Sequence, residues 1–462
     1  MTLIKSISGI RGTIGGAVGD NLTPIDAVKF ASAYGVWIKQ QRNKENYRVV
    51  VGRDARISGE MIQNLVMNTL VGLGIHVIDL GLSTTPTVEV AVPMEHADGG
   101  IILTASHNPK QWNALKLLNA KGEFLSGDDG AKILEIAETD QMNFSDVDSL
   151  GKITKNQAYI DMHIDEVLKM PLVNKKAIED ANFKVVVDGV NSTGGIAVPL
   201  LLDRLGVDTI KLYCEPNGHF PHNPEPLKEH LGDLANAVVK ERAYLGIVVD
   251  PDVDRLAFMD EKGEMFGEEY TLVACADYVL GKTPGNTVSN MSSTRALKDV
   301  TEKHGGNYQA SAVGEVNVVE IMKKNNAIIG GEGNGGIIYP ELHYGRDALV
   351  GIALFLSLLA EKRMSTSELR ASYPNYFMSK KKIELTPGLD VDAILKAMEE
   401  RYQNENINTI DGVKIDFSNS WVHLRKSNTE PIIRIYTEAP SQQEADELAD
   451  KIIAEIKAVA NI

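Results

Sequence analysis

Short apolar runs that stop abruptly at glycine or polar residues recur along this chain of 462 residues, and amphipathic stretches separate them. Residues 101–103, 183–187 and 245–249 are three such runs. A short apolar run bounded by turn residues is typical of a strand that is covered on both faces. Strands of this kind that alternate with amphipathic helices predict largely parallel α/β layers.

The α/β pattern restarts twice, so we expect three α/β domains over residues 1–152, 153–255 and 256–375. No residue-level repeat is strong enough to prove that these units are related. After residue 378 the pattern changes to short strands followed by a helix, which predicts a smaller α+β domain with an antiparallel sheet over residues 376–462. Its expected strands cover residues 414–417, 422–425 and 432–437, and its helix covers residues 442–458.

Composition excludes several classes of function. The formal net charge of −16 argues against nucleic-acid binding, which relies on broad basic surfaces. Clustered Arg and Lys side chains are still compatible with a small anionic substrate. The two cysteines, Cys214 and Cys275, lie far apart and fit a reducing cytosol. The N-terminus lacks the apolar core of a signal peptide.

The longest nearly apolar run, residues 348–360, is too short to span a bilayer, which needs about 20 residues. We therefore expect a buried helix there and a cytoplasmic protein with no membrane partner.

The apolar run at residues 101–103 leads into a polar loop in which Ser106 stands beside His107, and Asn108-Pro109 indicates a turn. Loops at the carboxyl ends of strands in open α/β sheets are where ligands bind. A serine there can act as a nucleophile or carry a covalent group. The alternative is an ordinary strand-to-turn connection in which Ser106 and Asn108 satisfy backbone groups.

The strongest motif is Asp250-Pro251-Asp252-Val253-Asp254-Arg255, directly after a buried strand. In an extended segment Asp250, Asp252 and Asp254 would project to one side. Converging carboxylates repel one another unless a cation offsets them, and hard oxygen ligands suit Mg²⁺. Arg255 could then orient a phosphate. The alternative is a solvated acidic turn, which the buried residues before it make less plausible.

Two further segments carry polar groups suited to a sugar phosphate. In the glycine-rich run at residues 330–336, Glu332 and Asn334 suit sugar hydroxyls, although a glycine-rich turn with no ligand would look similar. The turn at residues 425–431 and Arg434 suit a phosphate clamp, and the alternative is a charged hairpin tip. The clamp comprises Arg425, Lys426, Ser427, Asn428, Thr429 and Arg434.

Taken together in this order, the four segments resemble the α-D-phosphohexomutase family over the whole chain. The resemblance implies three similar α/β domains and a smaller fourth domain around a central cleft, with one functional loop from each. It implies a phosphoserine at Ser106 and one Mg²⁺ bound by Ser106, Asp250, Asp252 and Asp254. The phosphoryl group would pass from Ser106 to a hexose monophosphate and give a 1,6-bisphosphate, which returns its other phosphate to Ser106. Glucose or glucosamine 1,6-bisphosphate would act as activator.

The resemblance also implies roles for individual residues. Lys116 and Arg11 match active-site cations near the reacting phosphate, and Arg255 joins them in the expected catalytic set. Glu332 and Asn334 would recognise sugar hydroxyls. Arg425, Ser427, Asn428 and Thr429 would hold the non-reacting phosphate. Some relatives have a histidine where this chain has Glu315, so three residues compete as general acid or base: His107, Lys116 and Glu315, in that order of preference.

Two parts of the sequence indicate different sugar specificities. The loop at residues 330–336, with Asn334 and Gly336 where many relatives have Ser and His, resembles phosphoglucosamine mutases, as does Gly345-Arg346-Asp347. The segment at residues 220–226 is more similar to phosphomannomutases and phosphoglucomutases. We expect glucosamine phosphate as substrate, with glucose, mannose or broad specificity as the alternative. A metal-dependent phosphatase and a non-catalytic sugar-phosphate binder are rival classes, and the protein is expected to be a monomer or homodimer.

Overall fold

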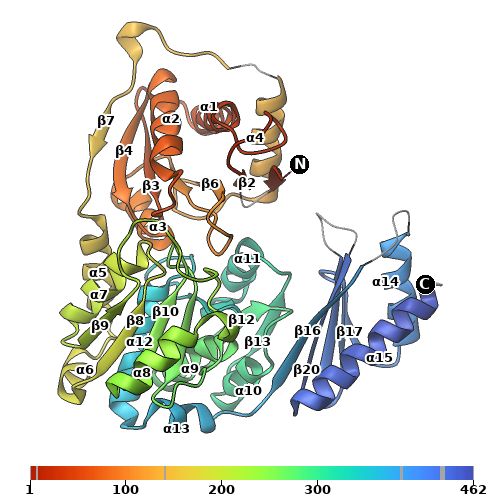
Figure 1. The fold of residues 1–462 in the computed structure, drawn as a ribbon. Coiled ribbons are helices and arrows are strands. Elements are labelled where there is room, and N and C mark those ends of the chain that lie inside the picture. Colours follow the sequence, from red (N-terminus) through yellow and green to blue (C-terminus); the bar gives the residue numbers. More distant parts are fainter. Residues whose placement is uncertain (1, 7–8, 140–141, 385–388, 427–431, 461–462) are drawn as a thin grey trace.

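The computed structural model describes residues 2–6, 9–139, 142–384, 389–426 and 432–460, and these form four β-sheets with flanking helices (Figure 1). Three mixed sheets follow one another along the chain, and an antiparallel sheet comes last. The expected fold class is therefore confirmed. No helix among the described residues is long and apolar enough to cross a membrane.

The first sheet has the strand order β1-β2-β6-β5-β3-β4-β7. Apolar side chains on its two faces pack against different helices, since Val49 and Val51 face one core cluster and Val50 faces another. The strands are β1 (Ile4–Ser6), β2 (Gly9–Thr13), β3 (Tyr47–Arg53), β4 (Ile75–Leu82), β5 (Gly99–Leu103), β6 (Trp112–Leu118) and β7 (Ile153–Lys155). The helices are α1 (Pro24–Gln41), α2 (Gly59–Gly72), α3 (Thr85–Met94) and α4 (Gly127–Thr139), followed by the short η1 (Val147–Ser149).

The second sheet has the order β11-β10-β8-β9. The sheet includes residues after 255, because β11 forms an antiparallel ladder with β10. The strands are β8 (Lys184–Asp188), β9 (Asp208–Leu212), β10 (Leu245–Val249) and β11 (Leu256–Asp260). The helices are α5 (Tyr159–Lys169), α6 (Lys175–Ala181), α7 (Gly194–Arg204), η2 (Lys228–His230) and α8 (Gly232–Glu241).

The third sheet has the order β13-β12-β14-β15. Its expected buried helix is α12, which packs against α9 in a core shared with the second unit, and Phe355 of α12 stacks on Phe258 of β11. The strands are β12 (Asn286–Asn290), β13 (Tyr308–Ser311), β14 (Ala327–Glu332) and β15 (Gly336–Ile338). The helices are α9 (Glu268–Lys282), α10 (Ala296–Lys303), α11 (Glu315–Asn325), α12 (Ala348–Lys362) and α13 (Thr366–Ala371).

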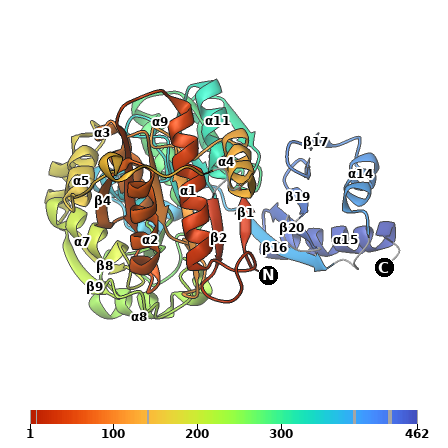
Figure 2. The same ribbon diagram turned by 90° about the horizontal axis from the view of Figure 1, so that it is seen from above.

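The fourth sheet is antiparallel, in the order β16-β20-β19-β18-β17, and has its own core. It stands beside the rest of the molecule in both ribbon views (Figures 1 and 2). The strands are β16 (Phe377–Glu384), β17 (Asn406–Asn408), β18 (Val413–Asp416), β19 (Trp421–Lys426) and β20 (Ile432–Ala439). The helices are α14 (Val391–Arg401) and α15 (Gln442–Ala460).

The first three units share one topology that the sequence does not reveal. Each contains three parallel strands followed by an antiparallel one, in the orders β4-β3-β5-β6, β9-β8-β10-β11 and β13-β12-β14-β15. In each unit the connection into the antiparallel strand carries a sequence motif: Ser106, Asp250 to Asp254, and Glu332 to Asn334. The repeated topology therefore gives these three loops equivalent positions in their domains.

Candidate active site

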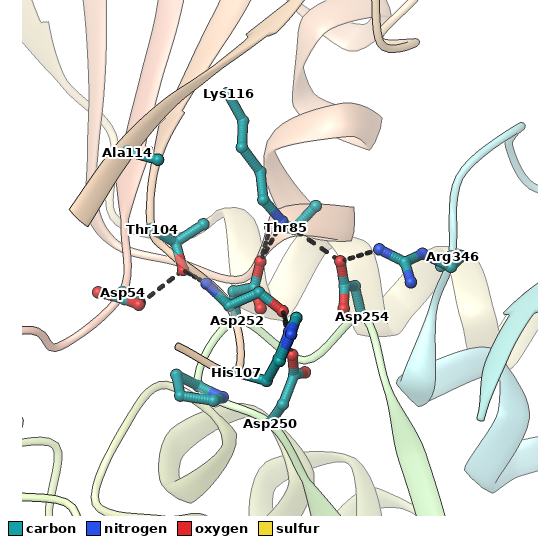
Figure 3. A network of polar contacts seen from close by, with 12 residues as sticks. Asp54, Thr85, Thr104, His107, Ala114, Lys116, Asp250, Asp252, Asp254 and Arg346 are labelled. Atoms are coloured by element: carbon teal, nitrogen blue, oxygen red, sulfur yellow. Dashed lines mark hydrogen bonds and ion pairs between the residues drawn. The ribbon is translucent and has the colours of Figure 1, made fainter. Parts of the chain in front are cut away.

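The Ser106 loop leaves the buried strand β5 with Ser106 itself in the left-handed region at φ +47°. This conformation is uncommon for a residue with a side chain, and such strain persists only where the surroundings enforce it. The backbone N–H of Ser106 donates to Thr104 Oγ1 at 2.9 Å, and Thr104 Oγ1 donates to Asp54 Oδ2 at 2.7 Å (Figure 3). The backbone of Ser106 is therefore fixed by the loop around it.

Arg56, which the sequence analysis did not single out, holds the same loop together. Its fully buried guanidinium donates to the carbonyl oxygens of Ser106 and Asn108, at 2.5 and 2.6 Å. It also donates to those of Pro109 and Trp112, at 2.8 and 3.0 Å. Asp54 Oδ2 accepts from Arg56 Nε at 3.0 Å and balances the charge. Only a planar, five-donor group can reach so many acceptors at once.

Asp250, Asp252 and Asp254 converge at the end of β10, and one carboxylate oxygen of each lies within 4.8 Å of the others. We expected an extended segment to bring these carboxylates together, and this was wrong. Residues 250–254 instead form a turn, with Val253 at φ +64°. All three residues are fully buried, so the alternative of a solvated turn is excluded. Burial and the charge of Asp252 raise the pKa of Asp250 well above its usual value.

Three groups of the first domain reach this cluster. Ser106 Oγ donates to Asp250 Oδ2 at 2.5 Å, and Lys116 Nζ lies 2.6 Å from Asp252 Oδ2 and 3.3 Å from Asp254 Oδ2 (Figure 3). Thr85 Oγ1 donates to Asp252 Oδ2 at 2.6 Å. Among the described residues, no hydrogen bond reaches the buried Oδ1 atoms of Asp252 and Asp254. Buried carboxylate oxygens without partners are costly, so the cluster suits a hard divalent cation such as Mg²⁺.

Arg346 connects the aspartate cluster to the third domain. Its guanidinium lies 2.7 Å from Asp254 Oδ2, 2.9 Å from Glu315 Oε2 and 3.0 Å from Glu332 Oε2. Glu315, a candidate acid or base, is therefore held in an ion pair, and its burial raises its pKa. Asn290 Nδ2 donates to Glu332 Oε1 at 2.8 Å, whereas the side-chain Oδ1 of Asn334 accepts from the N–H of Gly336 within its own turn.

The remaining candidates of the first two domains surround Ser106. His107 Nδ1 lies 3.3 Å from Ser106 Oγ, and Arg11 donates to Asn108 Oδ1 at 3.2 Å. Arg11 lies on β2. The N–H of Arg255 donates to Asp250 Oδ1 at 3.1 Å. Burial, followed by the charge of Arg255, lowers the pKa of His107 far below its usual range.

The expected phosphate clamp lies in the fourth sheet. Arg425 on β19 stands directly opposite Arg434 on β20. Asp411 accepts from Arg425 Nε at 3.0 Å, and its other oxygen accepts from the N–H of Val313 at 2.9 Å. Asp411 thus joins the clamp to the loop before Glu315. Ser427, Asn428 and Thr429 lie outside the described residues.

Comparison with known proteins identifies the family. Profiles described as phosphoglucomutase/phosphomannomutase, alpha/beta/alpha domains I, II and III, match residues 3–144, 159–263 and 267–376. The profile of the C-terminal domain of the same family matches residues 380–455. The chain belongs to the phosphoglucomutase/phosphomannomutase family.

Several relatives within the phosphoglucomutase/phosphomannomutase family align over nearly the whole chain. A protein named phosphoglucomutase/phosphomannomutase from Thermococcus kodakarensis is 35% identical, covering 94% of this chain and 96% of its own. One named probable phosphoglucosamine mutase from Methanopyrus kandleri is 32% identical, covering 96% of both chains. One named phosphoglucosamine/phosphogalactosamine mutase from Sulfurisphaera tokodaii is also 32% identical, covering 95% and 96%.

A solved structure of a family member from Burkholderia thailandensis has the same fold. Its TM-score is 0.85 at 24% identity, covering 99% of this chain and 98% of the other.

Proposed function

We propose that the protein is a phosphohexomutase that interconverts hexose 6-phosphates and hexose 1-phosphates, with glucosamine phosphate as its preferred substrate. The observation that carries this proposal is the 2.5 Å contact of Ser106 Oγ with the buried aspartate cluster, where Lys116 supplies a cation. A serine fixed beside carboxylates that suit Mg²⁺ is the arrangement that phosphoryl transfer needs, because this reaction depends on positioning and charge stabilisation. The relatives named as phosphohexose mutases support the same activity.

In this proposal Asp250, Asp252 and Asp254 hold Mg²⁺ together with the phosphorylated Ser106. The ion would stabilise negative charge on the transferring phosphoryl group. The bond between Ser106 Oγ and phosphorus breaks, and a sugar hydroxyl oxygen takes the phosphoryl group to give a 1,6-bisphosphate. The bisphosphate turns over and returns its other phosphate to Ser106.

His107 is the preferred acceptor of the sugar hydroxyl proton. Its Nδ1 lies 3.3 Å from Ser106 Oγ, the atom from which the phosphoryl group leaves. Lys116 suits a different role. Burial alone would lower the pKa of Lys116, but Asp252 and Asp254 raise it above its usual range, so this side chain stays a cation that binds phosphate.

The preference for an amino sugar rests on the charges around Arg346. Glu315 and Glu332 both contact this one guanidinium, so two carboxylates that the metal site does not use share one cation. A substrate ammonium group would be attracted to this surplus of negative charge, whereas a hydroxyl would gain less. In this arrangement Glu332 and Glu315 bind the sugar, and Asn334 stabilises the turn that follows Glu332.

The test is a comparison of kcat/KM for glucosamine, glucose and mannose 1-phosphates with Mg²⁺ and a 1,6-bisphosphate activator. We expect a preference for the amino sugar of about 100-fold, or about 2.7 kcal/mol in transition-state free energy. Comparable values for glucose or mannose would establish a mutase of broad specificity, as the name of the Thermococcus kodakarensis relative suggests. Steady release of inorganic phosphate without isomerisation would establish a phosphatase instead.

A further inference from the structure

Two histidines and two acids meet where the first three domains join, outside the aspartate cluster. Glu89 comes from α3, His163 from α5, and His343 and Asp347 from the segment between β15 and α12. Helices α3 and α5 lie side by side, and α5 also contacts α12 (Figure 1). The side chains of His163, Asp347 and Glu89 are at most 1% exposed, and that of His343 is 10% exposed. The proposed mutase chemistry uses none of these groups.

The imidazoles converge on one oxygen. His163 Nε2 lies 2.8 Å from Asp347 Oδ2, and His343 Nε2 lies 3.1 Å from the same atom. The three atoms all lie within 4.8 Å of one another. Asp347 caps α12, since its Oδ1 accepts from the N–H of Leu349 at 2.8 Å, and this bond aims Oδ2 at the histidines.

The outer nitrogen of each imidazole also faces a polar group. His163 Nδ1 lies 3.0 Å from Thr87 Oγ1, within hydrogen-bond distance. His343 Nδ1 lies 3.3 Å from Glu89 Oε2, a contact that lacks hydrogen-bond geometry. Histidines that bind metals nearly always present the other ring nitrogen to a carboxylate or another acceptor, which fixes the tautomer. Such partners leave both Nε2 atoms facing a common point.

Glu89 supplies an independent observation. Its carboxylate is buried, faces His343, and takes part in no hydrogen bond among the described residues. Two buried carboxylates, Glu89 and Asp347, therefore share one junction. A buried carboxylate without hydrogen bonds is strongly unfavourable unless a positive charge lies close by.

We propose that His163, His343 and Asp347 bind a divalent transition metal of the Zn²⁺ class, with Glu89 as the outer partner of His343. Two imidazoles and one carboxylate suit Zn²⁺ or Co²⁺, whereas Mg²⁺ prefers oxygen ligands, so this site and the aspartate cluster would select different ions. Metal–ligand distances of about 2.0–2.1 Å in a tetrahedron separate neighbouring ligand atoms by about 3.3 Å. The present contacts would open by a few tenths of an ångström.

Binding replaces the protons that now lie between Asp347 and the two imidazoles. The Nε2 proton of His343 leaves for solvent, and that of His163 is exchanged for one on Nδ1, which then donates to Thr87 Oγ1. The ion is bound by the second and third domains directly and by the first domain through Glu89 and Thr87. It therefore holds together the three domains whose loops form the proposed active site, and it stabilises the native chain because the unfolded chain lacks the site.

The test uses the full-length enzyme, freed of metal by chelation and then kept in excess Mg²⁺ to fill the aspartate cluster. One equivalent of Co²⁺ is added and its visible absorption is recorded. We expect the intense bands of nitrogen-coordinated tetrahedral Co²⁺, and a higher melting temperature with Zn²⁺. His163→Gln and His343→Gln should abolish both effects. His304→Gln, which removes a comparable contact with Asp277 at 2.9 Å, should preserve them, as should Asp252→Asn.

Bands that persist in the histidine variants and disappear in Asp252→Asn would overturn the proposal. X-ray absorption of the wild-type enzyme with one equivalent of Zn²⁺ decides the question if the variants fail to fold. Two imidazole ligands support the site, and a shell of oxygen atoms alone refutes it. Neither readout depends on turnover, so the site can fail while the mutase proposal stands.

Discussion

Ser106 Oγ and Asp250 Oδ2 lie 2.5 Å apart, although the two residues belong to different domains and are 144 positions apart in the chain. Each follows the third parallel strand of its own unit, β5 and β10. The equivalent loop of the third unit carries Glu332, which joins the same centre through Arg346. The contact between Ser106 and Asp250 therefore depends on the docking of two domains that repeat one topology.

Replacing Ser106 by alanine is expected to abolish phosphorylation and to lower kcat by at least about 1,000-fold, because the group that carries the phosphate is lost. Intact-mass spectrometry and a mutase assay measure the two effects. Ser357→Ala provides the control, since Ser357 is also buried and its hydroxyl makes only structural contacts, donating to the carbonyl oxygen of Ala353 and accepting from the N–H of Asn174. Normal turnover by Ser106→Ala would refute the proposed function.

Arg56→Lys is expected to disorganise the Ser106 loop. A lysine ammonium cannot reach the four carbonyl oxygens and Asp54 together, so buried acceptors lose their partners. We expect the free energy of unfolding to fall by about 3–5 kcal/mol and kcat to fall with it. Denaturant unfolding and steady-state kinetics measure both quantities.

The control for Arg56→Lys is Arg48→Lys, because Arg48 is half exposed and pairs loosely with Glu95. An Arg56→Lys enzyme with normal stability and kcat would show that the loop holds its conformation without the guanidinium.

The sequence predicted those helices, strands and site loops whose conformation depends on residues that are neighbours in the chain. The apolar run at residues 348–360 indicated a buried helix, and α12 (Ala348–Lys362) covers it. The buried strand before Asp250 predicted a ligand loop, yet the turn at residues 250–254 was missed. The positive φ of Val253 is unusual for a β-branched residue, so local preference argued against it.

The residues that the sequence analysis did not find act over long distances. Arg56 donates to carbonyl oxygens at least 50 positions away, and Asp411 accepts from the N–H of Val313, which is 98 positions away. Arg346 stood out only as a feature of specificity, although it joins Asp254, Glu315 and Glu332. A lone arginine or aspartate in a loop has no periodicity or spacing, so only the tertiary fold reveals its partners.

Asp411→Asn is expected to raise KM about tenfold for every sugar phosphate and to change kcat less. The carboxylate holds Arg425, the expected phosphate ligand, and an amide would lose the charge that orients the guanidinium. Because the phosphate is common to all substrates, the ratio of kcat/KM between sugars should stay constant. A change in that ratio with unchanged KM would assign Asp411 to sugar selection instead.

Asp450→Asn serves as the matched control for Asp411→Asn. It removes a carboxylate of the same domain that pairs with Lys381, which is outside the clamp, and Asp450 is 67% exposed. Exposed pairs contribute little, so KM should remain at the wild-type value.

His423 makes the docking of the fourth domain sensitive to acid. Its Nδ1 lies 2.9 Å from Ser292 Oγ of the third domain, and its Nε2 donates to the carbonyl oxygen of Asp411 at 2.6 Å. Burial lowers the pKa of His423 to about 4. Between pH 6.5 and pH 4 the unfolded chain therefore binds a proton that the native chain does not, so native stability is lost as the pH falls through this window.

The measurement is the free energy of unfolding at pH 7 and pH 5 for wild type and His423→Gln. Wild type should lose about 2 kcal/mol more than the variant over this interval, because glutamine does not titrate. His219→Gln, at an exposed position, should retain the wild-type difference. Equal losses of unfolding free energy in wild type and His423→Gln would contradict this prediction. They would mean that His423 is protonated in the folded protein at its ordinary pKa and that breaking its contacts with Ser292 and Asp411 has no cost.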